Sequence, residues 1–260
     1  MSNARGEPFD CRVQSGWKPL RDAATLGARI LRSALPQRCT LCVAVSGGAL
    51  LCEACAAQLP VSATGCPICA LPGEGSARCR ECGSKPPPFS TTIAAFVYEF
   101  PVDRLIQRIK YGGNIALIDW AAAALAAAVR VNLARRAPAD RPQKIAALPL
   151  ALARQRQHGF NQAGEIARRV SAALAIPMFA PLERARAGPP QAALPWSARR
   201  RNVRGAFALR LPVQGLRIAL VDDVMTTGAT LAEAARVLVD AGAANVECWV
   251  VARTPLRERT

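Results

Sequence analysis

Two adjacent carboxylates, Asp222 and Asp223, stand just before a run of small, hydroxyl-rich residues, Thr226, Thr227, Gly228, Ala229 and Thr230. Neighbouring carboxylates offer acceptor oxygens, which suit the vicinal hydroxyls of a sugar or a hydrated divalent cation. Backbone N–H groups at the start of a helix suit a phosphate, and threonine hydroxyls add donors. Together these residues indicate a sugar-phosphate site. The alternative is a structural turn in which Thr226 or Thr227 caps a helix, although a cap does not need two acids.

The elements that must position these groups flank them in sequence. Residues 218–221 are all apolar, which predicts a short strand buried on both faces and ending before Asp222. Residues 231–243 have apolar positions at helical spacing. The order strand, loop, helix puts the polar residues beyond the carboxyl end of a strand, where ligands bind in open α/β sheets.

The preceding segments continue the alternation of strands and helices. We expect strands at 93–99 and 144–149 and helices at 102–111, 115–135 and 163–175. This order predicts an α/β fold with a mostly parallel sheet and helices on both faces. The longest apolar run, 120–129, has ten residues and is rich in alanine, so it predicts a buried helix rather than a membrane span.

A cationic loop, 154–162, follows the strand predicted at 144–149. Because a diphosphate needs cationic donors, Arg154 and Arg156 are candidate ligands for pyrophosphate. Phe160 either stacks on a base or anchors the loop. His158, the single histidine, either acts as a base or is incidental, since no orienting carboxylate lies nearby in sequence.

Arginine dominates the charge of the chain. The formal net charge is +16, with 30 arginines against 4 lysines. The planar guanidinium matches phosphate, so this composition favours phosphorylated ligands or nucleic acid, unless it reflects only a genomic bias toward arginine and alanine. A basic, irregular stretch at 184–207 is either a flexible lid or a solvated loop.

Eight cysteines form four CxxC pairs with a repeated spacing: Cys39, Cys42, Cys52, Cys55, Cys66, Cys69, Cys79 and Cys82. Each of the last four follows its counterpart among the first four by 27 residues, which indicates a duplicated unit. Four thiolates suit one tetrahedral Zn²⁺, and such closed sites are structural rather than catalytic. Two consecutive ribbons are the simplest assignment, and a cross-braced pairing also uses all eight cysteines. Disulfides are the rival interpretation.

The 260 residues are enough for two domains. We expect an N-terminal extension of unknown role at 1–35, a double zinc ribbon at 36–85 and an α/β domain at 90–255, with Pro86 to Pro88 as a stiff linker. The first residues lack the apolar core of a signal peptide, so we expect a cytoplasmic protein, where thiols stay reduced and zinc is favoured over disulfides.

The stretch 218–230 resembles the phosphoribosyl pyrophosphate (PRPP) loop of type I phosphoribosyltransferases over all its positions. The resemblance implies that Asp222 and Asp223 hold the ribose 2′ and 3′ hydroxyls, that Thr226 to Thr230 wrap the 5′-phosphate, and that PRPP binds with Mg²⁺. Purine-specific relatives carry an acidic residue where this chain has Thr226, so a 6-oxopurine acceptor is disfavoured.

Tandem CxxC ribbons, then Lys110-Tyr-Gly112, Gly159-Phe-Asn-Gln162 and Gly205-Ala-Phe207, together resemble the ComF (GntX-like) family over about residues 36–255. The remaining motif residues are Gln191, Arg199, Asn202 and Val203. Members are similar to type I phosphoribosyltransferases and are linked to DNA uptake in competent bacteria, beside a DNA-translocating helicase. The chain departs from the family at His158, usually Arg, and at Gly188, often Thr.

Two functions remain open from the sequence. The first is an enzyme in which Asp222 and Asp223 clamp the ribose during transfer of ribose 5-phosphate from PRPP to an unknown acceptor, with release of pyrophosphate. The second is a non-catalytic module that binds PRPP, a nucleotide or single-stranded DNA and partners a helicase. The second accounts for the high charge and the missing acidic residue, and the first accounts for a full ribose clamp.

Overall fold

The computed structural model describes residues 37–73, 75, 77–150, 160–185 and 203–256. It divides into two compact units, 1–56 and 57–260, and the boundary falls within the range assigned above to the double ribbon. In the first unit, strands β1 (Gln37–Arg38) and β2 (Val45–Gly47) pair antiparallel. Helix α2 (Glu53–Ala57) follows them at the boundary.

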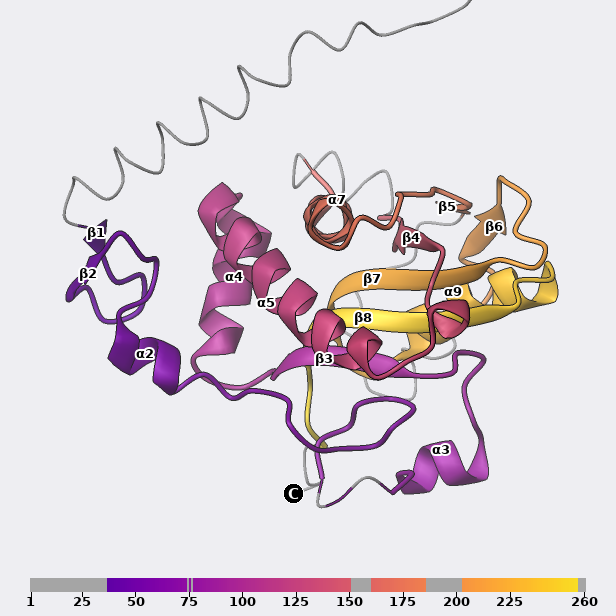
Figure 1. Cartoon of the computed structure of the whole chain (residues 1–260), viewed down its shortest axis with the longest axis horizontal. Helices are drawn as coiled ribbons and strands as arrows, with labels where there is room; N and C mark the ends of the chain where they lie inside the picture. Colours follow the sequence, from indigo (N-terminus) through magenta and orange to yellow (C-terminus); the bar gives the residue numbers. More distant parts are fainter. Residues whose placement is uncertain (1–36, 74, 76, 151–159, 186–202, 257–260) are drawn as a thin grey trace, which may run out of the picture. The chain divides into compact units, whose positions relative to one another are not determined.

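The second unit is built around a parallel sheet of four strands in the order β3-β8-β7-β4 (Figure 1). The strands are β3 (Thr92–Val97), β4 (Lys144–Ala147), β7 (Arg217–Met225) and β8 (Asn245–Arg253). β7 and β8 are the central pair; nearly all of β8 and the first half of β7 are buried, because helices cover a parallel sheet on both faces. The predicted fold class is confirmed.

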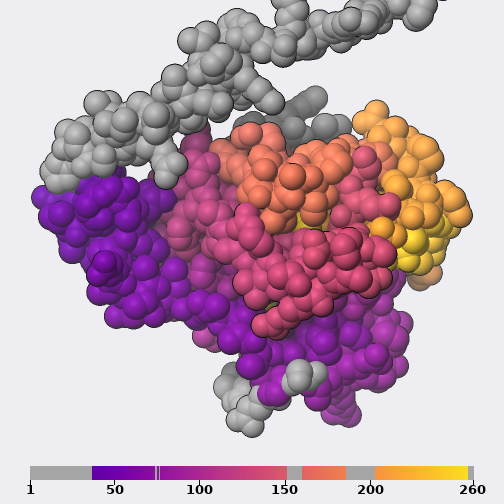
Figure 2. Space-filling view, in the orientation of Figure 1, coloured from indigo at the N-terminus to yellow at the C-terminus, as the bar shows by residue number. Residues whose placement is uncertain are grey.

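The helices of this unit are α3 (Arg80–Ser84), α4 (Val102–Gly112), α5 (Ile115–Ala134), α7 (Gln162–Leu174) and α9 (Ala229–Asp240), with a 3₁₀ turn, η2, at Pro138–Asp140. α5 contacts β3 and β8, and α7 contacts β4 and β7; both lie over the sheet on the face drawn in Figure 2. α9 packs Leu231 and Leu238 against Ile218 and Leu220 of β7 in one core cluster.

α5 is long and apolar enough, by length and composition alone, to cross a membrane. One face of it nevertheless packs within the fold, since Leu117, Leu125 and Val129 are fully buried. Trp120 stacks on Phe96 of β3, with ring centroids 5.3 Å apart. α5 is therefore accounted for as a core helix of the α/β domain.

A two-stranded hairpin, β5 (Leu182–Arg184) with β6 (Phe207–Leu209), joins the ends of the basic stretch 184–207. The guanidinium of Arg184 lies 5.5 Å from the ring centre of Phe207. Gly205 takes a left-handed conformation, φ +68°, that favours glycine, and its N–H donates to Glu233 Oε1 of α9 at 2.7 Å. Gln191, Gly188, Arg199 and Asn202 lie outside the described residues, so neither the lid nor the solvated-loop interpretation is tested.

The predicted elements agree with the structure apart from their boundaries. The largest difference is at β7, where the expected strand of four residues runs on through Asp222 and Asp223 to Met225. β8 causes the extension, because it pairs with β7 up to Met225↔Arg253 and so keeps the backbone extended. Both acids therefore lie within the strand, near its carboxyl end. α9 begins two residues earlier than predicted, at Ala229.

Candidate functional site

The two acids lie at the carboxyl end of β7, and both side chains are partly buried. Each carboxylate accepts a hydrogen bond from the next backbone N–H along the chain. Asp222 Oδ1 accepts from the N–H of Asp223 at 2.8 Å, and Asp223 Oδ1 accepts from that of Val224 at 2.6 Å. These bonds hold the two carboxylates in defined rotamers while leaving their second oxygens for other partners.

Lys110 is the residue of this site that the sequence did not reveal. It lies on the last turn of α4, and its Nζ is 3.1 Å from Asp223 Oδ2. Burial lowers the pKa of Lys110, but attraction to Asp223 and then Asp222 outweighs it, so the net shift is upward. The lysine is therefore a firmly charged cation beside the acids. Its place in the Lys110-Tyr-Gly112 motif was the signal that could have identified it.

The carboxyl group of Asp222 has an unusually high pKa. Burial and the neighbouring charge of Asp223 raise its pKa to about 7, although the N–H of Asp223, Lys110 and Arg184 all act in the opposite direction. Any ligand that supplies hydroxyl donors or positive charge would stabilise the ionised form of this carboxyl group. Strong perturbation of this kind is typical of functional sites.

The loop that follows turns tightly into α9. Gly228 has φ +74°, and Thr227 Oγ1 accepts from the N–H of Ala229 at 3.1 Å, so Thr227 helps to close the first turn of the helix. The N-cap of α9 is Gly228, so neither Thr226 nor Thr227 is the cap considered above, and the two carboxylates take no part in this turn. Thr226 and Thr230 flank this turn at the amino end of α9, which carries the positive end of the helix dipole.

Residues 160–162 of one family motif contact the carboxyl end of α4, which carries Lys110 of another motif beside Asp223. Gln162 Nε2 donates to the carbonyl of Lys110 at 3.4 Å. Gly113 has φ +56°, and a Cβ there would lie 3.4 Å from the ring of Phe160. Asn161 Nδ2 donates to the carbonyl of Leu148, the residue that follows β4 in the chain. Phe160 therefore packs against the end of α4, as the anchoring interpretation expects. Arg154, Arg156 and His158 lie outside the described residues.

The eight cysteines gather into two groups of four: Cys39, Cys42, Cys52 and Cys55 in one, and Cys66, Cys69, Cys79 and Cys82 in the other. Within each group the sulfurs lie within 4.8 Å of one another. The Sγ atoms of Cys42 and Cys52 are 3.7 Å apart, as are those of Cys69 and Cys79. Zn–S bonds of about 2.3 Å place tetrahedral thiolates about 3.8 Å apart, so both tetrads fit Zn²⁺, and the pairing is tandem.

Backbone donors favour the thiolate form of one cysteine in each tetrad, Cys39 and Cys66. Burial would raise the pKa of Cys39, but N–H groups of Cys42, Cys52 and Leu41 lower it to about 6. The same arrangement lowers the pKa of Cys66 to about 6 against the effect of burial, with donors from Cys69, Cys79 and Ile68. Such N–H donors are the usual second layer of a zinc site, and bound Zn²⁺ would act there as a structural clamp.

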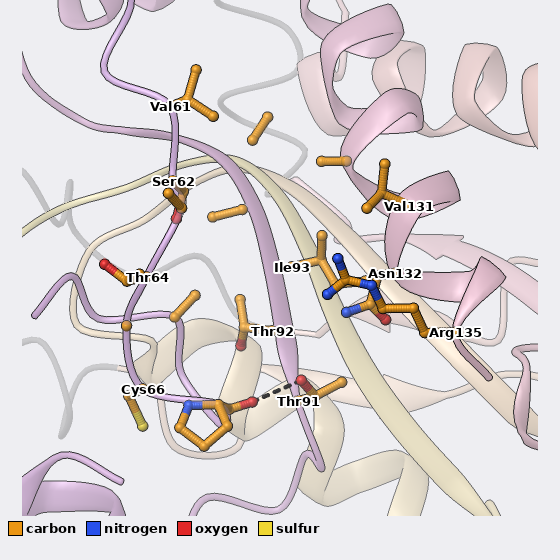
Figure 3. A pocket seen from close by; sticks show the side chains of 17 residues that line it. Val61, Ser62, Thr64, Cys66, Thr91, Thr92, Ile93, Val131, Asn132 and Arg135 are labelled. Carbon is orange, nitrogen blue, oxygen red and sulfur yellow. Dashed lines mark hydrogen bonds between the residues drawn. The ribbon is translucent and has the colours of Figure 1, made fainter. Parts of the chain in front are cut away.

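A hollow of about 520 Å³ lies beside the edge strand β3 (Figure 3). Its walls come from residues 61–67, from Thr92 and Ile93 of β3, and from Asn132 and Arg135 at the end of α5. Thr91 Oγ1 donates to the carbonyl of Pro67 at 2.8 Å at one border. None of its lining residues belongs to the stretch 218–230, so this hollow is distinct from the acid site.

Comparison with known proteins decides the family. A double zinc ribbon model matches residues 30–83, and a phosphoribosyl transferase domain model matches 127–259. The chain is 36% identical to the DNA utilization protein YhgH of Salmonella typhi over 228 residues, which cover 85% of this chain and 98% of that protein. The chain belongs to the ComF family. This ComF protein is also 32% identical over 179 residues to Competence protein F of Haemophilus influenzae, covering 67% and 78% of the two chains.

Solved structures similar to the ComF protein include a purine phosphoribosyltransferase from Pyrococcus horikoshii, with 19% identity, a TM-score of 0.33 and coverage of 55% of this chain and 78% of that one. The hypoxanthine-guanine phosphoribosyl transferase of Leishmania donovani has 14% identity, a TM-score of 0.32 and coverage of 52% and 71%.

Proposed function

We propose that this ComF protein binds PRPP with Mg²⁺ at the end of β7 and transfers its ribose 5-phosphate to an acceptor, releasing pyrophosphate. The observation that carries the proposal is the pair of partly buried acids directly before the helix-opening loop, with the pKa of Asp222 raised to about 7. Two crowded carboxylates are costly to keep in a fold unless a ligand uses them.

Asp222 and Asp223 would accept from the ribose 2′ and 3′ hydroxyls, and residues 226–230 would donate to the 5′-phosphate. Lys110 would balance the charge of the acids through its contact with Asp223. Mg²⁺, when bound with PRPP, supplies positive charge to the pyrophosphate; Asp222 and Asp223 are the described oxygen donors at the site that suit its hydration shell. Arg154 and Arg156 remain our proposed contacts for pyrophosphate.

In the reaction, the bond between ribose C1 and the pyrophosphate oxygen breaks, and its electron pair leaves with pyrophosphate. The acceptor atom forms a new bond to C1 and gives up its proton. Because positive charge develops on the ribose ring, fixed carboxylates close to the hydroxyls stabilise the transition state more than the ground state. Thr226 supplies no base, so the proton must leave to solvent or to another group, which disfavours a 6-oxopurine acceptor.

The names of the relatives, DNA utilization protein and competence protein, support a role in the uptake and use of DNA. They and the charge of +16 also support a second function, a non-catalytic module that binds PRPP, a nucleotide or single-stranded DNA and partners a helicase. In that case the acid site would act as a sensor.

One experiment separates the two. Zinc-loaded protein is incubated with PRPP, Mg²⁺ and a panel of bases while pyrophosphate is followed. Turnover that is lost in the Asp222→Asn, Asp223→Asn double variant and kept in Asp240→Asn, an exposed acid on α9, supports the enzyme. Calorimetric binding of PRPP or single-stranded DNA without turnover supports the binding module. Absence of PRPP binding at millimolar concentration overturns the enzyme, and absence of both PRPP and single-stranded DNA binding overturns both versions.

A further inference from the structure

Arg253 ends β8, is only 4% exposed, and joins two places that are far apart in the chain. Its Nε donates to the carbonyl of Cys69 at 2.8 Å. Its Nη1 donates to the carbonyl of Met225 at 3.1 Å, to that of Thr226, and to that of Thr254 at 2.9 Å. Cys69 is a member of the second tetrad. Met225 precedes, and Thr226 begins, residues 226–230, the segment proposed to bind the 5′-phosphate and called the phosphate loop below. One rigid guanidinium therefore connects a metal-binding turn with the loop.

The contact fixes the direction in which the loop amides point. In a trans peptide unit the C=O and the N–H of the next residue point in opposite directions. With the carbonyls of Met225 and Thr226 held on Arg253, the N–H groups of Thr226 and Thr227 are turned to the other side of the backbone. Those amides lie in the loop just before Gly228, the N-cap of α9, and face the place where a phosphate at the helix start would bind. Arg253 thus orients the donors without touching the ligand.

The turn that holds Cys69 is itself packed on the α/β domain. Thr91 Oγ1 donates to the carbonyl of Pro67 at 2.8 Å. Ile68 and Ala70 pack against the same core cluster as Met225. The cysteine turn and the loop are therefore linked by the hydrogen bonds of Arg253 and by a common core cluster. Because the core is close-packed, a shift of the turn displaces the loop.

Charge reinforces this link. Four thiolates outweigh the charge of one Zn²⁺, so the loaded tetrad is anionic, and Arg253 is a buried cation at its edge. Attraction between them favours the guanidinium in its observed place. Without metal the turn loses its clamp, and this attraction weakens.

We propose that Arg253 is a positioning residue through which metal binding by the second tetrad sets the phosphate loop for its ligand. The effect on affinity rests on the proposed binding of PRPP, whereas the effect on the loop does not. The first tetrad, which belongs to the other compact unit, serves as an internal control, since Cys52 corresponds to Cys79 in the repeat.

The first test compares Cys79→Ser with Cys52→Ser, each carrying one zinc instead of two. We expect Cys79→Ser to bind PRPP roughly tenfold more weakly than wild type, in the middle of the usual range for coupled sites, and Cys52→Ser to bind it as wild type does. Hydrogen exchange of peptides covering residues 222–230 should be faster in Cys79→Ser alone. Equal behaviour of the two variants overturns the proposal.

The second test keeps both zinc ions. Arg253→Lys preserves the charge but replaces a planar group with several donors by a single ammonium, which cannot reach Cys69 and Thr226 together. We expect normal zinc content, faster exchange at 222–230 and weaker PRPP binding. Thr91→Val, which breaks only the contact to Pro67, is the matched control and should have the smaller effect. Unchanged exchange in Arg253→Lys overturns the proposal even if Cys79→Ser does not fold.

The third test uses the reciprocity of coupled sites. After replacement of zinc by ¹¹³Cd²⁺, the spectrum should contain two cadmium resonances, and Cys79→Ser identifies that of the second tetrad. Addition of PRPP should shift that resonance and leave the other unmoved. If wild type binds no PRPP, the proposed function fails while the exchange measurements still decide the role of Arg253. Bound PRPP with both resonances unmoved contradicts the coupling.

Discussion

Lys110 Nζ lies 3.1 Å from Asp223 Oδ2, although 112 residues separate the two in the chain. The contact places the only described lysine of α4 beside a pair of acids that would otherwise repel each other. It explains how two adjacent carboxylates can remain close together at the end of a mostly buried strand.

Lys110→Gln should move the pH dependence of PRPP binding upward. The lysine lowers the pKa of Asp222, so its removal should raise that pKa further above about 7. Because ribose hydroxyls need ionised acceptors, binding at pH 7 should weaken several-fold and recover above pH 8. Calorimetric titrations between pH 6 and 9 measure this shift. Arg104→Gln, on an exposed part of the same helix, is the control, and an unchanged pH profile in Lys110→Gln contradicts the prediction.

Asp222→Asn should stabilise the ligand-free protein at high pH. The ordinary pKa of the group is 3.8 and the folded value is about 7, so the folded state holds the proton more tightly than the unfolded state. Wild type therefore loses stability as the pH rises from about 4 through 7, whereas the asparagine variant does not.

The gain should be on the order of a few kcal/mol above pH 7 and absent below about pH 4. The amide oxygen can still accept from the N–H of Asp223, so that contact survives. Thermal unfolding at pH 4, 6 and 8 measures the effect. Asp223→Asn removes the partner of Lys110 and should lower the unfolding temperature at pH 8 instead. A variant at position 222 that is less stable than wild type at every pH contradicts the prediction.

Purified protein should contain two zinc ions per chain, each with four thiolate ligands. Sulfurs 3.7 Å apart are too far for a disulfide and fit the edge of a tetrahedral site. Elemental analysis should give two zinc ions for wild type and one for Cys52→Ser or Cys79→Ser. Cys248→Ser, which changes a buried cysteine outside both tetrads, should keep two. Measured disulfides in place of zinc are the contrary result.

Arg136→Ala should strongly destabilise the fold without acting on the ligand site. Glu247 is fully buried, and its carboxylate accepts from Arg136 Nη1 at 2.5 Å and from Trp249 Nε1 at 2.6 Å. Removal of the arginine leaves an uncompensated buried charge, at a cost of about 3–5 kcal/mol. Adding Glu247→Gln, which keeps an acceptor for Trp249, should restore much of that loss. Urea unfolding of the single and double variants measures the coupling energy between Arg136 and Glu247. If the free-energy changes of the two single variants add up to that of the double variant, the prediction is wrong.

Local patterns in the sequence were sufficient for the chemistry of each site considered separately. The repeat of 27 residues identified the two cysteine tetrads, because CxxC turns carry their ligands within a few residues of one another. The run 218–230 likewise indicated strand, acids, loop and helix, since all four are local and follow from apolar periodicity and turn-forming residues. The parallel α/β class followed from the alternation of such segments.

Tertiary structure alone decided what stands beside these local units. Pairing with β8 extends β7 to Met225 and so puts both acids inside a strand. The packing of α4 brings Lys110 to Asp223, and the end of β8 brings Arg253 between Cys69 and Thr226. No short-range pattern encodes these contacts, because they depend on strand register and helix packing between residues that are from 27 to 184 positions apart in the chain. The sequence by itself determined which chemical groups are present, and the fold determined which of them act together.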